Sequence, residues 1–236
     1  MKKTLLIVLA IFALTLTNFA QKQFVGTIKY SVEVEEENMD AQQKAIIPTE
    51  YIITTDGVKI RIDRIAPMYT MTQLYDSKKG SMWFMIDAIV QKVASEQTKE
   101  DIIADKAEIK AILDSLKKAD PEIIYIDESK TIAGFKCKKA EAAVLDKENY
   151  VFYYTEELFF IPELKEYALK LFDGGKNLKG LPLEYVVTDE EGSMKVTAKE
   201  VIAKKPKSSL LFVDDDYEVM PWKDFKKAMG GGMADE

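Results

Sequence analysis

Side chains that carry enzyme chemistry are few in this sequence. It contains no histidine, which is the commonest general base and the commonest zinc ligand in proteins. Its single cysteine, Cys137, therefore has no imidazole partner and is expected to be a small buried hydrophobe. No serine lies in a G-x-S-x-G turn, and neither a P-loop nor a G-x-G-x-x-G motif is present. We expect no enzyme, no catalytic residue and no cofactor; a carboxylate-dependent hydrolase is the remaining enzymatic alternative.

Acidic residues are abundant, and the formal net charge of the chain is −7. This charge argues against nucleic acid as a partner, because nucleic-acid binders concentrate Lys and Arg on one face. The run Asp214–Asp216 with Glu218 offers the oxygen ligands that Ca²⁺ prefers. It lacks the spacing and the turn glycine of an EF-hand, so we interpret it as a solvated acidic loop and expect no metal.

The segment Met82–Ile86 is apolar at every position. In a strand, Trp83 and Met85 would share one face, with Met71 on a segment just upstream. Methionine recurs at adaptable apolar binding surfaces. Either both faces of this strand are packed in the core, or one face meets a ligand. We therefore take Met71, Trp83 and Met85 as candidate residues of a hydrophobic binding cavity.

A second aromatic region runs from Val151 to Ile161. Its first part has the composition of a strand, from which Phe152 and Tyr154 are further cavity candidates. Its second part, Leu158–Ile161, would form ordinary core, a hydrophobic lip or an exposed patch for a protein partner. Leu164 and Leu171, on one face of the helix expected next, complete the candidate cavity.

Two short motifs have structural interpretations. Gly180-Leu181-Pro182 is expected to fix the backbone at the entry to a strand at 183–188, because Gly and Pro favour turns. Lys136, Lys138 and Lys139 are expected to form a solvated strand face, with contact to an acidic headgroup as the alternative.

The elements that hold these residues are mostly strands. From Phe24 to Glu35, apolar and polar residues alternate, which indicates a strand with one buried face. Asp56-Gly57 separates two β-rich runs and is the strongest local hairpin signal in the chain. Further turns are expected at Ser77–Gly80, Asp146–Asn149 and Glu190–Ser193. About ten strands result, and neighbours joined by tight turns are antiparallel.

Helices are expected at Lys99–Lys118 and Pro162–Phe172. Both have apolar residues at helical spacing, and Thr98 is a plausible N-cap for the first. A shorter amphipathic segment, Trp222–Met229, follows near the end of the chain. If the antiparallel sheet curls, the two longer helices would cover its concave face as a lid over an apolar cavity.

The first 20 residues have the pattern of a secretory signal peptide. Lys2-Lys3 precede an apolar run from Leu5 to Leu16, and Ala20 is a small residue at the expected cleavage point. No cysteine lies there, so we expect a soluble periplasmic or secreted protein that is not a lipoprotein and has no membrane span after cleavage. Residues 21–229 would form one domain, and residues 230–236 a flexible tail.

Several segments resemble exported families of unknown function that share the lipoprotein-carrier (LolA-like) fold, including the GLPGLI family. They are Phe24–Tyr30, Ile132–Ala140, Tyr153–Thr155, Gly180–Tyr185 and Ser209–Phe212. Leu183 follows Pro182 where a GLPGLI protein carries a second glycine. The resemblance implies a mainly β (α+β) fold, an incomplete barrel with helices packed on its concave face. Carriers of this fold shelter the lipid chains of lipoproteins, so the resemblance implies a binding role.

Two functional hypotheses follow from these observations. The first is an exported protein that binds a lipid, a lipidated protein or another hydrophobic ligand between the curled sheet and its helices. The second is an envelope protein-interaction module with no internal ligand, for which an exposed apolar patch around Leu158–Ile161 is expected. The sequence leaves the ligand, the partner and the oligomeric state open.

Overall fold

The computed structural model describes residues 23–35, 39–116, 121–144, 148–189 and 192–229. The expected leader at 1–20 and the expected tail at 230–236 lie outside the described residues. The same holds for residues 145–147 and 190–191, which belong to two of the expected turns, and for the end of the first expected helix at 117–118.

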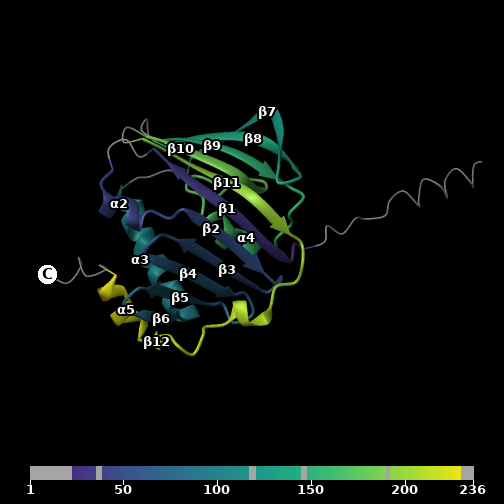
Figure 1. The fold of residues 1–236 in the computed structure, drawn as a ribbon. Coiled ribbons are helices and arrows are strands. Elements are labelled where there is room, and N and C mark those ends of the chain that lie inside the picture. The colour runs from purple at the N-terminus through teal and green to yellow at the C-terminus, as the bar shows by residue number, and fades with distance from the viewer. Residues whose placement is uncertain (1–22, 36–38, 117–120, 145–147, 190–191, 230–236) are drawn as a thin grey trace, which may run out of the picture.

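In the described part of the chain, twelve strands form one sheet in the order β12-β6-β5-β4-β3-β2-β1-β11-β10-β9-β8-β7 (Figure 1). Neighbouring strands are antiparallel, except that β12 runs parallel to β6. The sheet is open, with β12 and β7 at its two ends. The strands are β1 Gly26–Val34, β2 Glu50–Thr55, β3 Lys59–Ile65, β4 Tyr69–Asp76, β5 Ser81–Ala88, β6 Lys92–Gln97, β7 Ile123–Ile132, β8 Phe135–Val144, β9 Glu148–Thr155, β10 Leu181–Thr188, β11 Ser193–Ile202 and β12 Glu218–Val219. The prediction of a mainly β, open sheet is confirmed.

The turn between β2 and β3 shows why the sequence signal is strong there. The Asp56 carboxylate accepts hydrogen bonds from the backbone N–H groups of Val58 and Lys59, at 2.9 and 2.8 Å. Gly57 has a φ of 89°, a conformation that glycine adopts without steric penalty. The predicted hairpin is confirmed, and so is the turn at Ser77–Gly80 that joins β4 to β5.

The helices differ from their predicted bounds mainly at the ends. They are α2 Ala41–Ile46, α3 Lys99–Leu116, α4 Pro162–Leu169 and α5 Trp222–Ala228, with the 3₁₀ helix η1 at Ser208–Leu211. Thr98 caps α3 as predicted, because its hydroxyl accepts from the Asp101 N–H at 3.2 Å while Asp101 accepts from the Thr98 N–H at 2.9 Å. The sequence analysis did not identify α2, whose capping box joins Asp40 to Gln43.

Helix α4 is shorter than the predicted helix Pro162–Phe172. After Leu169 the backbone tightens: Lys170, Leu171 and Phe172 donate to carbonyls three residues earlier. The apolar residues Leu171 and Phe172 remain buried, so the hydrophobic pattern continues past the end of the α-helix. Periodicity alone therefore overestimated the length of α4.

The curvature of the sheet brings distant strands around one core. Helix α4 contacts both β3 and β10, which are separated in the sheet by three other strands. Buried side chains of β3, such as Ile62, belong to the same hydrophobic cluster as Phe152 of β9 and Leu164 of α4. The concave face of the sheet is thus filled in this region by α4 and the residues that follow it.

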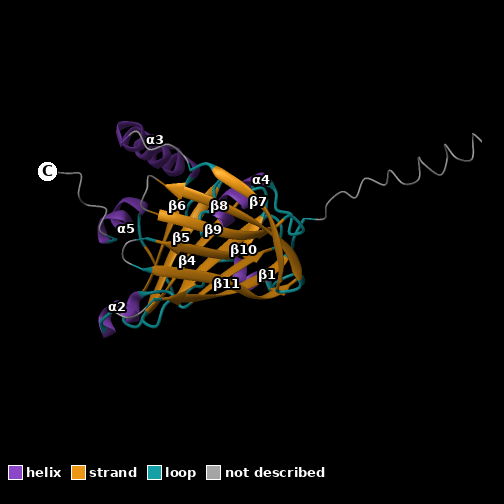
Figure 2. Ribbon diagram, turned by 90° about the horizontal axis from the view of Figure 1, so that it is seen from above, coloured by secondary structure: helices purple, strands orange, loops and turns teal. Residues whose placement is uncertain are grey.

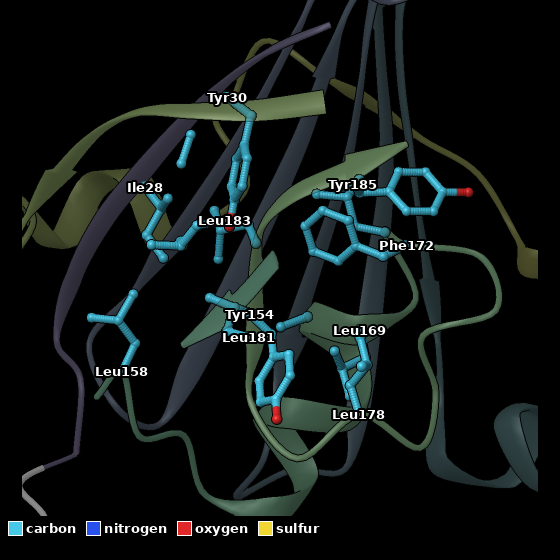
Figure 3. Close-up of a cluster of buried hydrophobic side chains, with 14 of the residues drawn as sticks. Ile28, Tyr30, Tyr154, Leu158, Leu169, Phe172, Leu178, Leu181, Leu183 and Tyr185 are labelled. Atoms are coloured by element: carbon cyan, nitrogen blue, oxygen red, sulfur yellow. The ribbon is translucent and has the colours of Figure 1, made fainter. Parts of the chain in front are cut away.

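Aromatic rings make up much of this core. Phe172 meets the edges of the Tyr30 and Tyr185 rings at centroid distances of 5.6 and 5.9 Å, and Phe152 stacks on Tyr185 at 5.4 Å. Figure 3 shows Tyr30 of β1, Tyr185 of β10 and Phe172 of the segment that follows α4 within this core. The hydroxyl of Tyr30 donates to the Pro182 carbonyl at 3.0 Å, which satisfies a buried polar group.

The convex face of β3–β6 is also covered. The chain after β11 runs across it through η1 and β12 (Figure 1). Leu211 packs against Leu74, Met85 and Ala94, and Trp83 lies against the same cluster. Lys59 and Arg61 donate to the backbone carbonyls of Leu211 and Leu210 at 3.1 and 3.2 Å. We call residues 203–220 the C-terminal strap.

Cys137 is fully buried, as predicted. Burial raises the pKa of its thiol to about 11, so the thiol is protonated at neutral pH. A protonated buried thiol is a weak nucleophile, and Cys137 therefore acts as a core residue.

Gly180, the first residue of the Gly-Leu-Pro motif, lies where the neighbouring backbone leaves no room for a Cβ atom. A Cβ atom at this position would lie 2.2 Å from the carbonyl oxygen of Thr155 on the neighbouring strand. We expect Gly180→Ala to lower the free energy of unfolding by about 3 kcal/mol, because the clash is with backbone that cannot rotate away. Urea denaturation followed by tryptophan fluorescence measures the effect.

Gly134, in the turn between β7 and β8, provides the control. Its φ is 87°, and an added Cβ would meet no atom within 4 Å. Gly134→Asn is expected to cost less than about 1 kcal/mol, because asparagine tolerates the left-handed region. Equal stability of Gly180→Ala and wild type would rule out the close approach of Gly180 to Thr155.

Candidate functional site

A cavity of about 610 Å³ lies between the concave face of β4–β6 and the helices α3 and α5. Figure 2 shows both helices at one end of the curved sheet. The floor of the cavity consists of side chains from β4 and β5 that include Met71, Met82, Phe84 and Ile86. Most of the lining is apolar. Sites for small molecules in proteins are of about 300–1,000 Å³ and are mostly apolar, so this cavity has the size and character of a binding site.

Helix α5 forms one wall of the cavity through two aromatic residues. Trp222 stacks on Phe84 of the floor at a centroid distance of 5.0 Å, and Phe225 lies 6.2 Å from the same ring. Trp222 and Phe225 are 5.8 Å apart. The spacing of three residues places both rings on one face of the helix. The amphipathic pattern of 222–229 thus directs its apolar face into the cavity.

Asp105 of α3 joins α3, α5 and the sheet. Its carboxylate accepts hydrogen bonds from Gln97 of β6 at 2.5 Å, from the Trp222 indole at 2.9 Å and from Lys226 at 2.8 Å. Partial burial favours the neutral acid, but the hydrogen bonds and the charge of Lys226 outweigh it and lower the pKa of Asp105. Asp105 is therefore ionised at neutral pH and holds α5 against α3.

Removal of this charge is expected to loosen α5. We expect Asp105→Asn to raise amide hydrogen exchange in 222–229 by about tenfold, because Lys226 loses a charged acceptor. Glu100→Gln, on the exposed first turn of α3, is the control and should leave exchange unchanged. Unchanged exchange in Asp105→Asn would show that α5 is held by its aromatic contacts alone.

The same interaction predicts a pH dependence. The pKa of Asp105 lies below its ordinary value of 3.8 in the folded protein. Its contribution to α5 docking is therefore fully present above that pH and is lost as the pH falls through the lowered pKa. Exchange in 222–229 should rise at acid pH in the wild type, after correction for the intrinsic rate, and less so in Asp105→Asn.

Besides α3 and α5, the end of α4 also borders the cavity. Tyr167 is buried and stacks on Tyr75 of β4 at a centroid distance of 3.8 Å. The ammonium of Lys170 lies 4.0 Å from the centre of the Tyr167 ring, and both residues line the cavity. Burial raises the pKa of the Tyr167 hydroxyl, which remains neutral.

Three of the candidate residues lie on β4 and β5, but the structure separates them. Met71 and Met85 contribute to the cavity wall. Met85 also packs into the convex cluster. Trp83 does not reach the cavity: it lies on the convex face against the C-terminal strap and borders a separate hollow there. Alternation places Trp83 and Phe84 on opposite faces, and Phe84 is the one that faces the cavity.

The other four candidates, Phe152, Tyr154, Leu164 and Leu171, are buried in the main core. None of them lines the 610 Å³ cavity. The structure therefore does not bring the seven candidates together in one site. The core around α4 takes up the concave side of β8–β10, and the cavity is confined to the β4–β6 side.

Sequence analysis missed the residues that α3 and α5 contribute to this cavity. Asp105, Trp222, Phe225 and Lys226 were not among the candidates. The available signal was the pair of aromatic residues three positions apart in an amphipathic segment near the end of the chain. The residues that this segment faces depend on its contact with β5, which is distant in sequence and cannot be predicted from local patterns.

Of the two surface features that the sequence suggested, the lysines Lys136 and Lys138 are exposed as expected for a solvated strand face, whereas the apolar segment at 158–161 differs from its prediction. Leu158 and Phe160 are buried, Ile161 is partly buried, and Phe159 is the one exposed residue of the four, so the continuous exposed apolar patch expected at Leu158–Ile161 is not present. The reason is that this segment packs against the first strand region, where Phe24 donates its N–H to the Phe159 carbonyl. Lys138 is paired with Glu156, at 3.0 Å.

The described residues provide neither a membrane-spanning helix nor a cluster of metal ligands. None of the helices there is long and apolar enough to cross a membrane. The same residues include no cluster of three or more histidine, cysteine, aspartate or glutamate side chains placed to hold a metal ion. Within the C-terminal strap, Asp216 of the acidic run is paired with Lys92 at 2.9 Å.

Comparison with known proteins identifies no family. No family model matches the chain, and no curated protein matches it. Among solved structures it is similar to PNGF-II, with a TM-score of 0.46 and 16% identity over 88% of this chain and 33% of that one. It is also similar to MucB, with a TM-score of 0.36 and 12% identity over 85% of this chain and 61% of that one.

A third similar structure is the complex of Pseudomonas aeruginosa MucA/MucB. The TM-score is 0.33 at 12% identity, over 82% of this chain and 58% of that one. This chain thus spans about a third of PNGF-II and less than two thirds of MucB. TM-scores this low do not transfer a function. The resemblance to GLPGLI-related proteins remains a prediction.

Proposed function

We propose that this chain is a non-enzymatic exported protein that holds one apolar ligand in the cavity between β4–β6 and the helices α3 and α5. The cavity itself is the observation that carries the proposal. Solvent-exposed apolar walls of this extent are unfavourable in water, and each methylene of a ligand buried against them contributes about 0.8 kcal/mol. The LolA-like resemblance of the sequence agrees with a ligand held on the concave face.

Helix α3 is the movable part in this proposal. It contacts β5 and β6 and is fixed to α5 through Asp105, whereas α4 is anchored in the core between β3 and β10. Opening α3 and α5 together would expose Met71, Phe84 and Ile86 without disturbing the core around α4. The lid is therefore α3 with α5, and α4 is a fixed wall.

A chain-length series tests the proposal. Saturated fatty acids of increasing length would be titrated against the protein, with displacement of a fluorescent acyl probe as the measurement. Because a buried methylene contributes about 0.8 kcal/mol, affinity should rise about fourfold per methylene until the cavity is full, and then level off. Absence of saturable binding for every chain length would refute the proposal.

Native mass spectrometry of the protein isolated from its own cells is the complementary experiment. A bound lipid or acyl compound at one per chain is expected. A second measurement on the variant Ile86→Glu, in which the cavity floor is changed, should give the mass of the protein alone. Retention of the same compound by that variant would place the ligand elsewhere.

A further inference from the structure

Three lysines line the cavity, and they differ in their partners. Lys226 is paired with Asp105 at 2.8 Å, and Lys106 is paired with Glu166 at 3.2 Å. Lys170 has no carboxylate within ion-pair distance among the described residues. Its ammonium instead lies over the Tyr167 ring. Lys170 is also exposed, so it stands where the cavity opens to solvent.

The charges around Lys170 leave this end of the cavity positive. The carboxylate that acts on it is Glu166, and Lys106 already occupies that carboxylate. This carboxylate is therefore paired with Lys106 and only lies near Lys170. The other acids of the lining, Asp105 and Glu108, act on Lys226 at the α5 side. Partial withdrawal from water lowers the pKa of Lys170, as expected for an ammonium near apolar groups without a paired carboxylate.

We propose that the ligand is a single-chain amphiphile with a carboxylate head, a long-chain fatty acid, with its head on Lys170 and its chain in the cavity. This inference rests on the proposed function and gives the ligand its chemical class. An apolar wall with one unpaired cation at its mouth matches an apolar chain with one anion at its end. A carboxylate there would provide the partner that Lys170 lacks within the described residues.

The volume of the cavity limits the number of chains. With a methylene taken as about the size of a water molecule, ~30 Å³ in the liquid, a cavity of about 610 Å³ holds about 20 methylenes at full packing. This volume matches one chain of about 12–18 carbons more closely than the two chains of a diacyl lipid.

Two probes of equal chain length and different head test the assignment. Palmitate and hexadecanol would each be titrated against wild type and against Lys170→Gln. Wild type should prefer palmitate by about five- to tenfold, the range of a charge-assisted contact at a partly exposed site. Lys170→Gln should lose this preference and keep its affinity for hexadecanol. High salt should reduce the preference in wild type.

Lys179→Gln is the matched control, because Lys179 also lies over a tyrosine ring, that of Tyr125 at 4.1 Å, but does not line the cavity. It should bind both probes as wild type does. Equal binding of both probes by wild type, or an unchanged preference in Lys170→Gln, would overturn the role of Lys170 and leave the cavity proposal intact. If neither probe binds wild type, the proposed function fails as well.

Discussion

Phe152→Ala is expected to lower the free energy of unfolding by about 3–5 kcal/mol and to leave ligand affinity unchanged in the folded fraction. Phe152 is fully buried, stacks on Tyr185 and is paired with Ala140 on the neighbouring strand β8. Its removal opens a void that neighbouring strands cannot fill, because they are fixed by their backbone ladders. Urea denaturation measures the stability, and probe titration below the transition measures the affinity.

Phe159→Ala is the control for side-chain size. Phe159 is 37% exposed. Its backbone carbonyl accepts a hydrogen bond from the Phe24 N–H, which the substitution retains. We expect a loss of no more than about 1 kcal/mol. A Phe152→Ala protein of near wild-type stability with weakened ligand binding would contradict the assignment of Phe152 to the core and return it to the ligand site.

The strands and turns of this fold were accessible from local sequence. Alternation of apolar and polar residues marks β1, and Asp56-Gly57 marks the β2–β3 hairpin through its own side-chain and backbone chemistry. These features depend on residues within a few positions of one another. The short parallel strand β12 was not accessible, because it forms only where the C-terminal strap reaches the edge of β6.

The location of the cavity was not accessible in the same way. The sequence of β5 predicts that Trp83 and Phe84 face opposite sides, but it does not say which side is concave. That choice depends on Leu211, which covers the Trp83 side, and on Trp222, which stacks on Phe84. Both residues come from the last part of the chain. Long-range packing therefore decides which side chains of β5 face the cavity.

The charged residues of the site could not be predicted from the sequence for a similar reason. Asp105 and Lys226 are far apart in sequence and meet only because α5 packs beside α3. In a chain with 33 basic and 40 acidic residues, such a pair cannot be selected by composition. Lys170 is notable only after the partners of Lys106 and Lys226 are known. The sequence analysis instead considered headgroup contact for the lysines at 136–139, of which Lys138 and Lys139 are paired with carboxylates.

Ile86→Glu is expected to abolish binding of acyl probes, with a loss of at least about a hundredfold in affinity. Ile86 lies on the cavity floor beside Met71, and its side chain is only partly buried when the cavity is empty. A carboxylate there is hydrated in the empty protein, but an incoming acyl chain would strip that water. The effective penalty for desolvating an ion is several kcal/mol, which exceeds what a few buried methylenes contribute.

Ile89→Glu is the matched control, since it introduces the same charge at the tip of the same hairpin. Ile89 is 80% exposed, so its replacement should change neither affinity nor stability by a measurable amount. Thermal unfolding of both variants separates a lost ligand from a lost fold. Because Ile86 lines the cavity and not the main core, Ile86→Glu should remain folded. Full affinity for acyl probes in a folded Ile86→Glu protein would mean that this cavity does not hold the ligand.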